Sequence, residues 1–297
     1  MRNRNNTSNA RRAEMQIIKP RVKIITEKNL IRKIRMAYAI CYKNEDNIDW
    51  KNCIEWIERK VAMGHSSPCE HVRVKIPYAT YDKLYSKFYV KNNNKLPYGF
   101  QSRVNVVNLK GKNFVYMNVR DWLNIGGKIR DIERFEEAPD YMTVKIICNR
   151  GISHELVRHR QMAFTQESTR YCNYKSTMKF IEQGYEDKVF DDKSRFKIWM
   201  RNLIFEWNCK LCEIGYKWML RFGATPQEAR NILPNSLKTE IWVTGTETAW
   251  NDFYKLRMAK GAHPQMREIA AMIMDEEHYA LYTDNGCCYE PQKTGNS

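Results

Sequence analysis

A polar segment, residues 150–174, directly follows an apolar run and constrains the fold of this chain more than any other feature. The preceding residues 141–148 are apolar and rich in β-branched side chains, which predicts a buried strand. After them Ile152, Leu156 and Phe164 mark the apolar side of a predicted helix, and we expect Ser153 to cap it. Residues 165–171 then consist almost entirely of side chains that form hydrogen bonds. So many polar groups are costly to bury unless a polar ligand satisfies them.

The charged residues of this segment favour an anionic ligand. On the predicted helix His154 and Arg158 lie on one face, and Glu155 and His159 lie on the adjacent face. Arginine suits phosphate oxygens, because its donors lie in one plane and its charge is not lost. A solvated helix face with salt bridges accounts for the same composition, and the residues alone leave both interpretations open.

The spacing within the segment resembles a known signature. Arg158-His159-Arg160 is followed at fixed intervals by Ser168 and by Arg170-Tyr171. This is similar to the motif of the flavin-dependent thymidylate synthases, which reads RHR, two residues, S, one residue, N, E, one residue, S, one residue, RY. Ala163, Thr165 and Gln166 stand where that motif has serine, asparagine and glutamate.

Three further segments resemble the same family, in the same order along the chain. Residues 64–71 are similar to its GH-x-S/T-P-x-EH loop, residues 229–234 to AR-x-x-LP, and residues 250–269 to F-x-x-LR…AQPEIRE. Asn118-Val119-Arg120 resembles an N-x-R of larger members, and its role is open. The flavin-contacting Asn-x-Arg of compact members falls on Thr246 and Thr248, so the adenine-side flavin contacts are not defined.

The resemblance implies an enzyme that methylates dUMP reductively to dTMP. Methylenetetrahydrofolate would supply the carbon as co-substrate, and FAD reduced by NADPH would supply the hydride. The flavin would be held between the subunits of a homotetramer. The chain contains no GxGxxG after a strand and no GxxxxGKS/T, so neither a Rossmann dinucleotide site nor a P-loop is indicated.

The resemblance also implies roles for particular residues. Arg257 would stabilise negative charge on the uracil and is the expected catalytic residue, while Arg230 would reach the nucleotide from a neighbouring subunit. The expected substrate-binding residues are Glu155, Arg158, Gln166, Glu167, Ser168, Arg170, Arg230 and Arg257. The expected flavin-binding residues are His65, Ser67, Arg158, His159, Arg160 and Gln166. We expect no metal site, because His65 and His71 have no matched second pair.

Two alternatives to this enzyme remain, and the cysteine content indicates a compartment. Residues 1–35 carry eleven Lys or Arg against two Glu, which is +9 of the total net charge of +16. A nucleic-acid-binding protein without enzymatic activity would explain this charge but not the ordered motifs. A flavin-free nucleotide hydrolase that uses a metal is a further alternative. The nine cysteines are odd in number and scattered, so we expect reduced thiols, none of them a nucleophile, and a cytoplasmic protein without a membrane span.

The remaining periodicity predicts an α+β fold. We expect helices within residues 30–63, a strand from Val72, and a hairpin that turns at Lys110-Gly111. Apolar residues at helical spacing from Phe196 to Trp218 predict a long helix, whose stripe is core or packs on another subunit. We therefore expect a single mixed α/β domain of the flavin-dependent thymidylate synthase type. It would be helix-rich, span residues 15–285 with an insertion at about 80–140, and lie between a basic tail (1–14) and a C-terminal tail (286–297).

Overall fold

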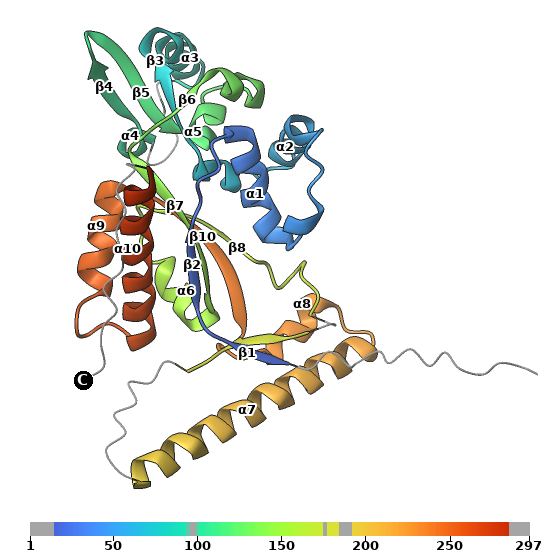
Figure 1. The fold of residues 1–297 in the computed structure, drawn as a ribbon. Coiled ribbons are helices and arrows are strands. Elements are labelled where there is room, and N and C mark those ends of the chain that lie inside the picture. The colour runs from blue at the N-terminus through green and yellow to red at the C-terminus, as the bar shows by residue number, and fades with distance from the viewer. Residues whose placement is uncertain (1–14, 94, 96–99, 175–176, 184–191, 285–297) are drawn as a thin grey trace, which may run out of the picture.

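The computed structural model describes residues 15–93, 95, 100–174, 177–183 and 192–284, and Figure 1 shows their arrangement. Both predicted tails lie outside the described residues. Two four-stranded antiparallel sheets follow one another along the molecule, and a long helix runs past the far end of the lower sheet. The mixed, helix-rich α+β class is therefore confirmed.

The lower sheet has the strand order β2-β7-β10-β8 and is antiparallel throughout. Its strands are β2 (Arg21–Ile24), β7 (Tyr141–Asn149), β8 (Ala163–Gln166) and β10 (Lys238–Thr246). The long central pair runs in register from Tyr141 opposite Thr246 to Asn149 opposite Lys238. Alternate residues face opposite ways in such a pair. Val144 and Ile146 thus pack on helices α9 (Glu247–Arg257) and α10 (Pro264–Asp284), whereas Trp242 packs on helix α1 (Leu30–Tyr42).

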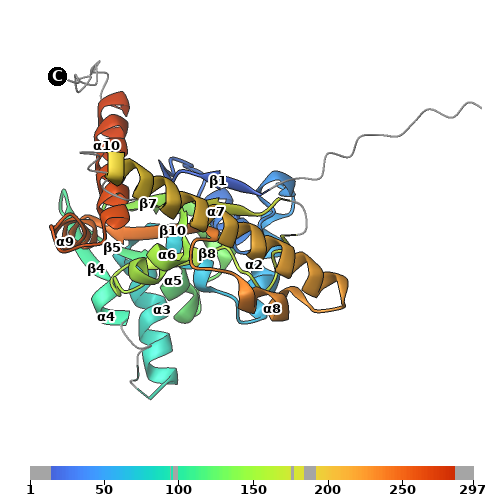
Figure 2. The ribbon, with the colours of Figure 1, turned by 90° about the horizontal axis from the view of Figure 1, so that it is seen from below.

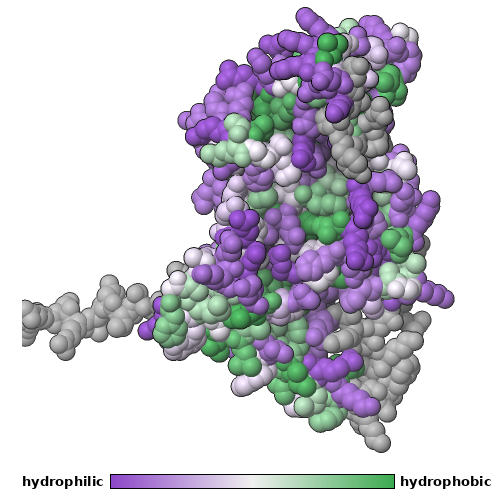
Figure 3. All heavy atoms as spheres, turned by 180° about the vertical axis from the view of Figure 1, so that it is seen from behind, coloured by the Kyte–Doolittle hydropathy of each residue, from purple (hydrophilic) through white to green (hydrophobic). Residues whose placement is uncertain are grey.

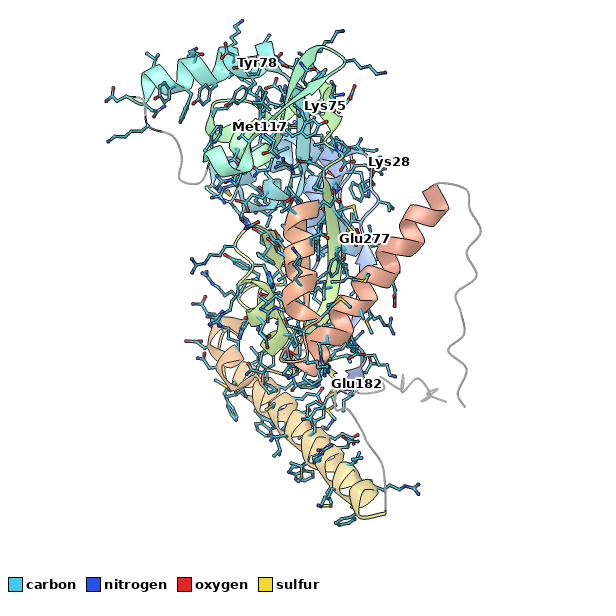
Figure 4. All side chains as sticks on the ribbon, turned by 90° about the vertical axis from the view of Figure 1, so that its left-hand side faces the viewer. Lys28, Lys75, Tyr78, Met117, Glu182 and Glu277 are labelled. Carbon is cyan, nitrogen blue, oxygen red and sulfur yellow. The ribbon has the colours of Figure 1, made fainter. Side chains whose placement is uncertain are left out.

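The upper sheet has the order β4-β5-β3-β6, and three of its four strands lie within the predicted insertion. Its strands are β3 (Arg73–Pro77), β4 (Asn105–Leu109), β5 (Lys112–Asn118) and β6 (Glu136–Glu137). The hairpin turns where predicted, with positive φ at Lys110 (52°) and Gly111 (78°), as a two-residue type I′ turn requires. Four α-helices and three 3₁₀ helices accompany this half besides α1: α2 (Cys53–Ala62), α3 (Tyr78–Lys91), α4 (Phe100–Arg103), α5 (Val119–Asn124), η1 (Glu45–Asn47), η2 (Ser67–His71) and η3 (Ile129–Arg134). In Figure 4, Lys75, Tyr78 and Met117 mark this half.

The 3₁₀ helix η2 lies where the two halves meet. On one side Glu70 accepts a charged hydrogen bond from Arg120 of α5. On the other side Nδ1 of the fully buried His71 lies 2.7 Å from Oγ1 of Thr244 on β10. Two adjacent residues of η2 thus contact the two halves of the molecule, Glu70 the upper half through α5 and His71 the lower sheet through β10. Asn118 caps α5 by accepting a hydrogen bond from the backbone of Asp121, so the N-x-R triplet, whose role was open, links the upper sheet to η2.

The remaining elements gather at the lower end. They are β1 (Gln16–Ile18), paired in parallel with β9 (Lys179–Ile181), then α6 (Arg150–Leu156), α7 (Asp192–Arg221), α8 (Pro226–Ala229) and η4 (Arg230–Ile232). Glu182, just after β9, accepts at its backbone a hydrogen bond from Gln265 near the start of α10 (2.9 Å; Figure 4). A capping box at Thr225 and Glu228 begins α8.

Helix α7 crosses beneath the body of the molecule and leaves most of its large apolar side chains uncovered (Figures 1 and 2). The predicted long helix is confirmed, and Gly223 follows it with a φ of +93°. Its exposed side chains include Phe196, Trp199, Leu203, Ile204, Trp207, Leu211, Ile214 and Trp218. Figure 3 shows hydrophobic surface along this lower edge. Within the described part of the chain, no helix combines the length and the hydropathy needed to cross a bilayer.

Candidate functional site

Arg257, the last residue of α9, is held by two residues of the polar segment. Its Nη1 donates to Oε2 of Glu155 (2.8 Å), its Nη2 to the backbone oxygen of Glu155 (2.9 Å), and its Nε to Nε2 of His159 (2.9 Å). The Arg257 side chain is only 12% exposed. A guanidinium has five N–H donors, so two remain for a ligand. The three residues were predicted on resemblance alone, and the fold brings them together.

Because Arg257 donates to it, Nε2 of His159 is an acceptor, and the ring is neutral with its proton on Nδ1. Burial, and then the positive charge of Arg257, lower the pKa of His159 below its ordinary value. The ring packs edge-on against Phe253, with centroids 5.1 Å apart. His159 therefore faces inward onto α9 and acts on the position of Arg257.

The prediction that Ser153 caps a helix extending to Phe164 was wrong. Asn149 caps α6 by accepting a hydrogen bond from the backbone of Ile152 (2.7 Å), and Ser153 is buried inside the helix. Helix α6 ends at Leu156, and Phe164 lies in strand β8. The C-terminal end of α6 is set by the sheet, because residues 163–166 take the extended conformation in order to pair with β10.

The early end of α6 also separates the residues predicted to share its faces. His154 and Arg158 do not lie on one helix, and neither do Glu155 and His159. Arg158 and Arg160 lie in the turn that follows α6, where both are exposed. Their guanidinium groups make no ion pair with any described residue, so both remain available to an anion.

Gln166, at the end of β8, points into the interior between two hydroxyl groups. Its Nε2 donates to Oγ of Ser153 (2.8 Å) and to Oγ1 of Thr239 (3.0 Å). Both amide hydrogens are thereby used, and only the Oε1 acceptor remains for a ligand. The amide in place of the family's carboxylate thus joins β8, α6 and β10.

Glu167 is buried, and its carboxylate already has three partners. These are the hydroxyl of Tyr174 (2.9 Å) and the ammonium groups of Lys238 (3.1 Å) and Lys43 (3.3 Å). Burial and the adjacent negative charge raise the pKa of Tyr174. Contact between Glu167 and a substrate stays a prediction; in this structure the carboxylate anchors the end of β8 and thereby the residues that follow it.

Residues 168–171 form a turn, the 168–171 turn, against α8 and η4. Oγ of Ser168 accepts from the backbone of Arg170 (3.3 Å), and Nε of Arg170 donates to Oε1 of Gln227 (3.4 Å). Nη1 of Arg230 donates to Oγ1 of Thr169 (3.5 Å). The predicted nucleotide residues Ser168, Arg170 and Arg230 therefore gather within one chain. Arg230 was expected to act mainly on a neighbouring subunit's nucleotide, and that assignment stays a prediction.

His65 lies in a group of aromatic rings close to this turn. Its Nδ1 is 3.1 Å from the hydroxyl of Tyr42, and its backbone oxygen accepts from Tyr38. The ring of Tyr42 also contacts that of Tyr171, which is 59% exposed (centroids 5.5 Å apart). Burial, and then the charge of Lys60, lower the pKa of His65. Ser67, at the start of η2, is partly exposed nearby in sequence.

The cysteines near the motifs are not activated. Burial raises the pKa of Cys69 to about 12 and that of Cys172 to about 11. A nucleophilic cysteine needs the opposite shift, since the thiolate is the reactive form. The seven cysteines in the described part of the chain are free thiols. Among the described residues no group of three or more metal-ligating side chains occurs.

A cavity of about 550 Å³ beside Glu155 contains residues to which the sequence analysis gave no role. They include Asn149, Asn235, His263 and Gln265. Asn149 donates to Gln265, which joins the start of α6 to the start of α10. Asn149 directly follows the predicted apolar strand, and asparagine is strongly preferred at the N-cap of a helix. This preference would have identified Asn149 as the cap of α6.

Comparison with known proteins gives these residues a family context. Residues 135–279 match the family model described as thymidylate synthase complementing protein. A flavin-dependent thymidylate synthase of Pyrococcus furiosus is 32% identical over 131 residues, which are 43% of this chain and 50% of that protein. Its counterpart in Mycobacterium tuberculosis is 29% identical over 128 residues, 41% of this chain and 51% of that protein. The matches thus span about half the length of these curated relatives.

Two solved structures resemble the whole chain more distantly. One is a UMP/dUMP methylase, PolB, from Streptomyces cacaoi bound with 5-Br dUMP (17% identity, 91% of this chain and 93% of that one, TM-score 0.43). The other is thymidylate synthase X from Helicobacter pylori with FAD and dUMP (15% identity, 89% and 98%, TM-score 0.39). These TM-scores are too low to support a conclusion about this chain. Residues 135–279, which contain the Arg257–His159–Glu155 group and the 168–171 turn, thus match the model of thymidylate synthase complementing proteins and are similar to flavin-dependent thymidylate synthases.

Proposed function

We propose that this chain is an enzyme that methylates dUMP to dTMP. The observation that carries the proposal is the Arg257–His159–Glu155 group. A sparingly exposed arginine with two unused donors, fixed by three hydrogen bonds, suits a planar group that gains negative charge during a reaction. The match of residues 135–279 to the model of thymidylate synthase complementing proteins supports uracil as that group.

FAD fits the residues present. The exposed Arg158 and Arg160 can pair with its pyrophosphate, and the ring group at His65 and Tyr171 offers apolar surface beside hydrogen-bonding atoms. Thr246 is engaged as the cap of α9, so it does not replace the family's Asn-x-Arg directly. When bound and reduced by NADPH, FAD supplies the hydride, and methylenetetrahydrofolate supplies the carbon.

The residues of this chain bind the nucleotide and orient its uracil ring. Ser168, Arg170 and Arg230 hold the phosphate and sugar side of the nucleotide, and Gln166 presents Oε1 near the start of the 168–171 turn. Arg257 directs its two remaining N–H groups at the uracil. Fixed donors stabilise the developing charge without reorganising at the moment of reaction, which is where such groups contribute most.

We further infer a homotetramer. The α7 face carries large aromatic and aliphatic side chains that the described chain leaves uncovered, Trp207 for example at 67% exposure. Monomers rarely expose contiguous apolar patches of this kind. A second copy of the chain, which would bring the same apolar helix face, is the occupant we propose.

The visible spectrum of the purified protein, followed by an assay, tests the proposed function. We expect flavin absorbance after incubation with FAD. We also expect dTMP to form from dUMP, methylenetetrahydrofolate and NADPH in the absence of air, with no effect of a chelator. A protein that stays colourless and forms no dTMP while binding DNA in a salt-dependent manner would contradict the proposal in favour of a nucleic-acid-binding protein.

A further inference from the structure

A small cationic cavity lies beside the 168–171 turn. It encloses about 280 Å³ and is lined by Arg150, Thr169, Arg230, Asn231, Leu233, Pro234 and Asn235. None of these seven described residues carries a carboxylate, and two carry a guanidinium. The cavity therefore has a positive charge that its own lining does not balance, together with hydroxyl and amide groups that form hydrogen bonds.

The backbone holds Arg150 firmly at one wall of this cavity. Arg150 is the first residue of α6, and its N–H donates to the backbone oxygen of Leu237 (3.2 Å). Its own oxygen accepts from Oγ of Ser153 (2.9 Å), and the N–H of Gly151 donates to the oxygen of Asn235 (3.2 Å). The side chain thus starts from a point fixed between the end of β7 and the residues that lead into β10.

The guanidinium of Arg150 has donor capacity that the protein does not use. Its Nη1 is buried and has no hydrogen-bond partner among the described residues. A buried charged donor without a partner is costly, and such an arrangement is common where a ligand supplies the acceptor. Across the cavity, the hydrogen bond from Nη1 of Arg230 to Thr169 is long, at 3.5 Å, so Arg230 can also turn its donors to a ligand.

We propose that Arg150 and Arg230 together bind the phosphate group of the nucleotide, and that Arg150 is a substrate-binding residue. Two planar forks suit the oxygens of a phosphomonoester dianion, and the cavity is large enough for such a group. Arg150 lies outside every motif quoted above. The identity of the anion as a nucleotide phosphate rests on the proposed function, whereas the anion site itself rests only on the cavity and its two arginines.

The experiment compares ligands with and without phosphate. Binding of dUMP, deoxyuridine and inorganic phosphate is measured by calorimetry for the parent, Arg150→Met, Arg150→Lys and a matched control, Arg59→Met, on the exposed side of α2. We expect Arg150→Met to weaken dUMP and phosphate binding about 10- to 100-fold, the range for hydrogen bonds to charged groups. Deoxyuridine binding should stay within about twofold, because it makes no phosphate contact.

Arg150→Lys keeps a charge but loses the planar fork, so we expect an intermediate loss. If circular dichroism shows that Arg150→Met does not fold, Arg150→Lys tests the assignment of Arg150 in its place. If the folded Arg150 variants keep the parent's ratio of dUMP to deoxyuridine affinity, the assignment of Arg150 is overturned and the proposed function stands. If phosphate binds in an Arg150-dependent way but dUMP binds no better than other phosphomonoesters, the anion site stands and the nucleotide assignment is overturned.

Discussion

Nε of Arg257 donates a hydrogen bond of 2.9 Å to Nε2 of His159, a residue 98 positions earlier in the chain. The bond requires an unprotonated Nε2, and the lowered pKa of His159 keeps the ring in that form at neutral pH. The histidine of the RHR run, expected at the flavin, thus also orients the residue expected at the uracil.

Replacing Arg257 by alanine should reduce dTMP formation about a hundredfold or more, as expected for loss of one fixed electrostatic stabiliser. Glu155 and His159 then lose their shared partner, and because His159 is also expected at the flavin, flavin content shows whether its position has changed. Turnover and flavin content are measured on the same preparation. Full turnover in the variant would exclude Arg257 as the catalytic residue.

Arg170→Ala and Arg230→Ala should each weaken dUMP binding by about 1.5–3 kcal/mol, the range for hydrogen bonds to charged groups. Their contacts with Gln227 and Thr169 are long, so the fold loses little. Titration of dUMP against the flavin spectrum gives the affinities, and flavin content serves as the control. Unchanged affinity in both variants would refute their assignment to the nucleotide.

The double variant Cys69→Ser, Cys172→Ser should keep dTMP formation within about tenfold of the parent, a barrier change of no more than roughly 1.4 kcal/mol. Both thiols have raised pKa values, so neither supplies a thiolate near neutral pH. The assay uses dUMP, methylenetetrahydrofolate and NADPH without air. A variant that is folded and loaded with flavin yet inactive would contradict a mechanism in which the hydride reaches the uracil without help from a cysteine.

Trp207→Glu combined with Leu211→Glu should lower the mass of the assembly measured by light scattering. Both side chains are exposed on α7, so a charge there costs the single chain little stability but is expensive inside an interface. Val90→Glu, at a residue that is also exposed but lies on α3, is the control and should leave the mass unchanged. An unaltered tetramer in the α7 variant would place the interface elsewhere.

His71 should make the protein less stable in acid. Its folded pKa of about 3 lies below the ordinary value of 6.5, because burial opposes the charged ring. Between these values the unfolded chain binds more protons, so stability is complete above pH 6.5 and falls as the pH drops toward 3. From pH 7.5 to 5 the loss from this residue is about 2 kcal/mol. Urea unfolding of the parent and His71→Gln at both pH values measures it, and an equal loss in both would contradict this origin.

The sequence by itself determined the features that depend on neighbouring residues. The strand at 141–148, the Lys110-Gly111 turn, the capping box at Thr225 and the long helix α7 all follow from local spacing and backbone preference. The RHR run and the later Ser168, Arg170 and Tyr171 likewise predicted, from spacing alone, the resemblance that the match of residues 135–279 confirms.

Tertiary structure decided what depends on partners distant in the sequence. Pairing of β8 with β10 holds Phe164 in a strand, so helix α6 ends at Leu156 rather than extending to Phe164 as the local pattern predicted. The carboxylate of Glu167 is buried and already paired with Lys238 and Lys43, which are distant in the sequence. The fold likewise places Arg150 and Arg230 in the lining of one cavity. The energies of burial and pairing belong to contacts across more than 70 residues, so no local window of the sequence contains them.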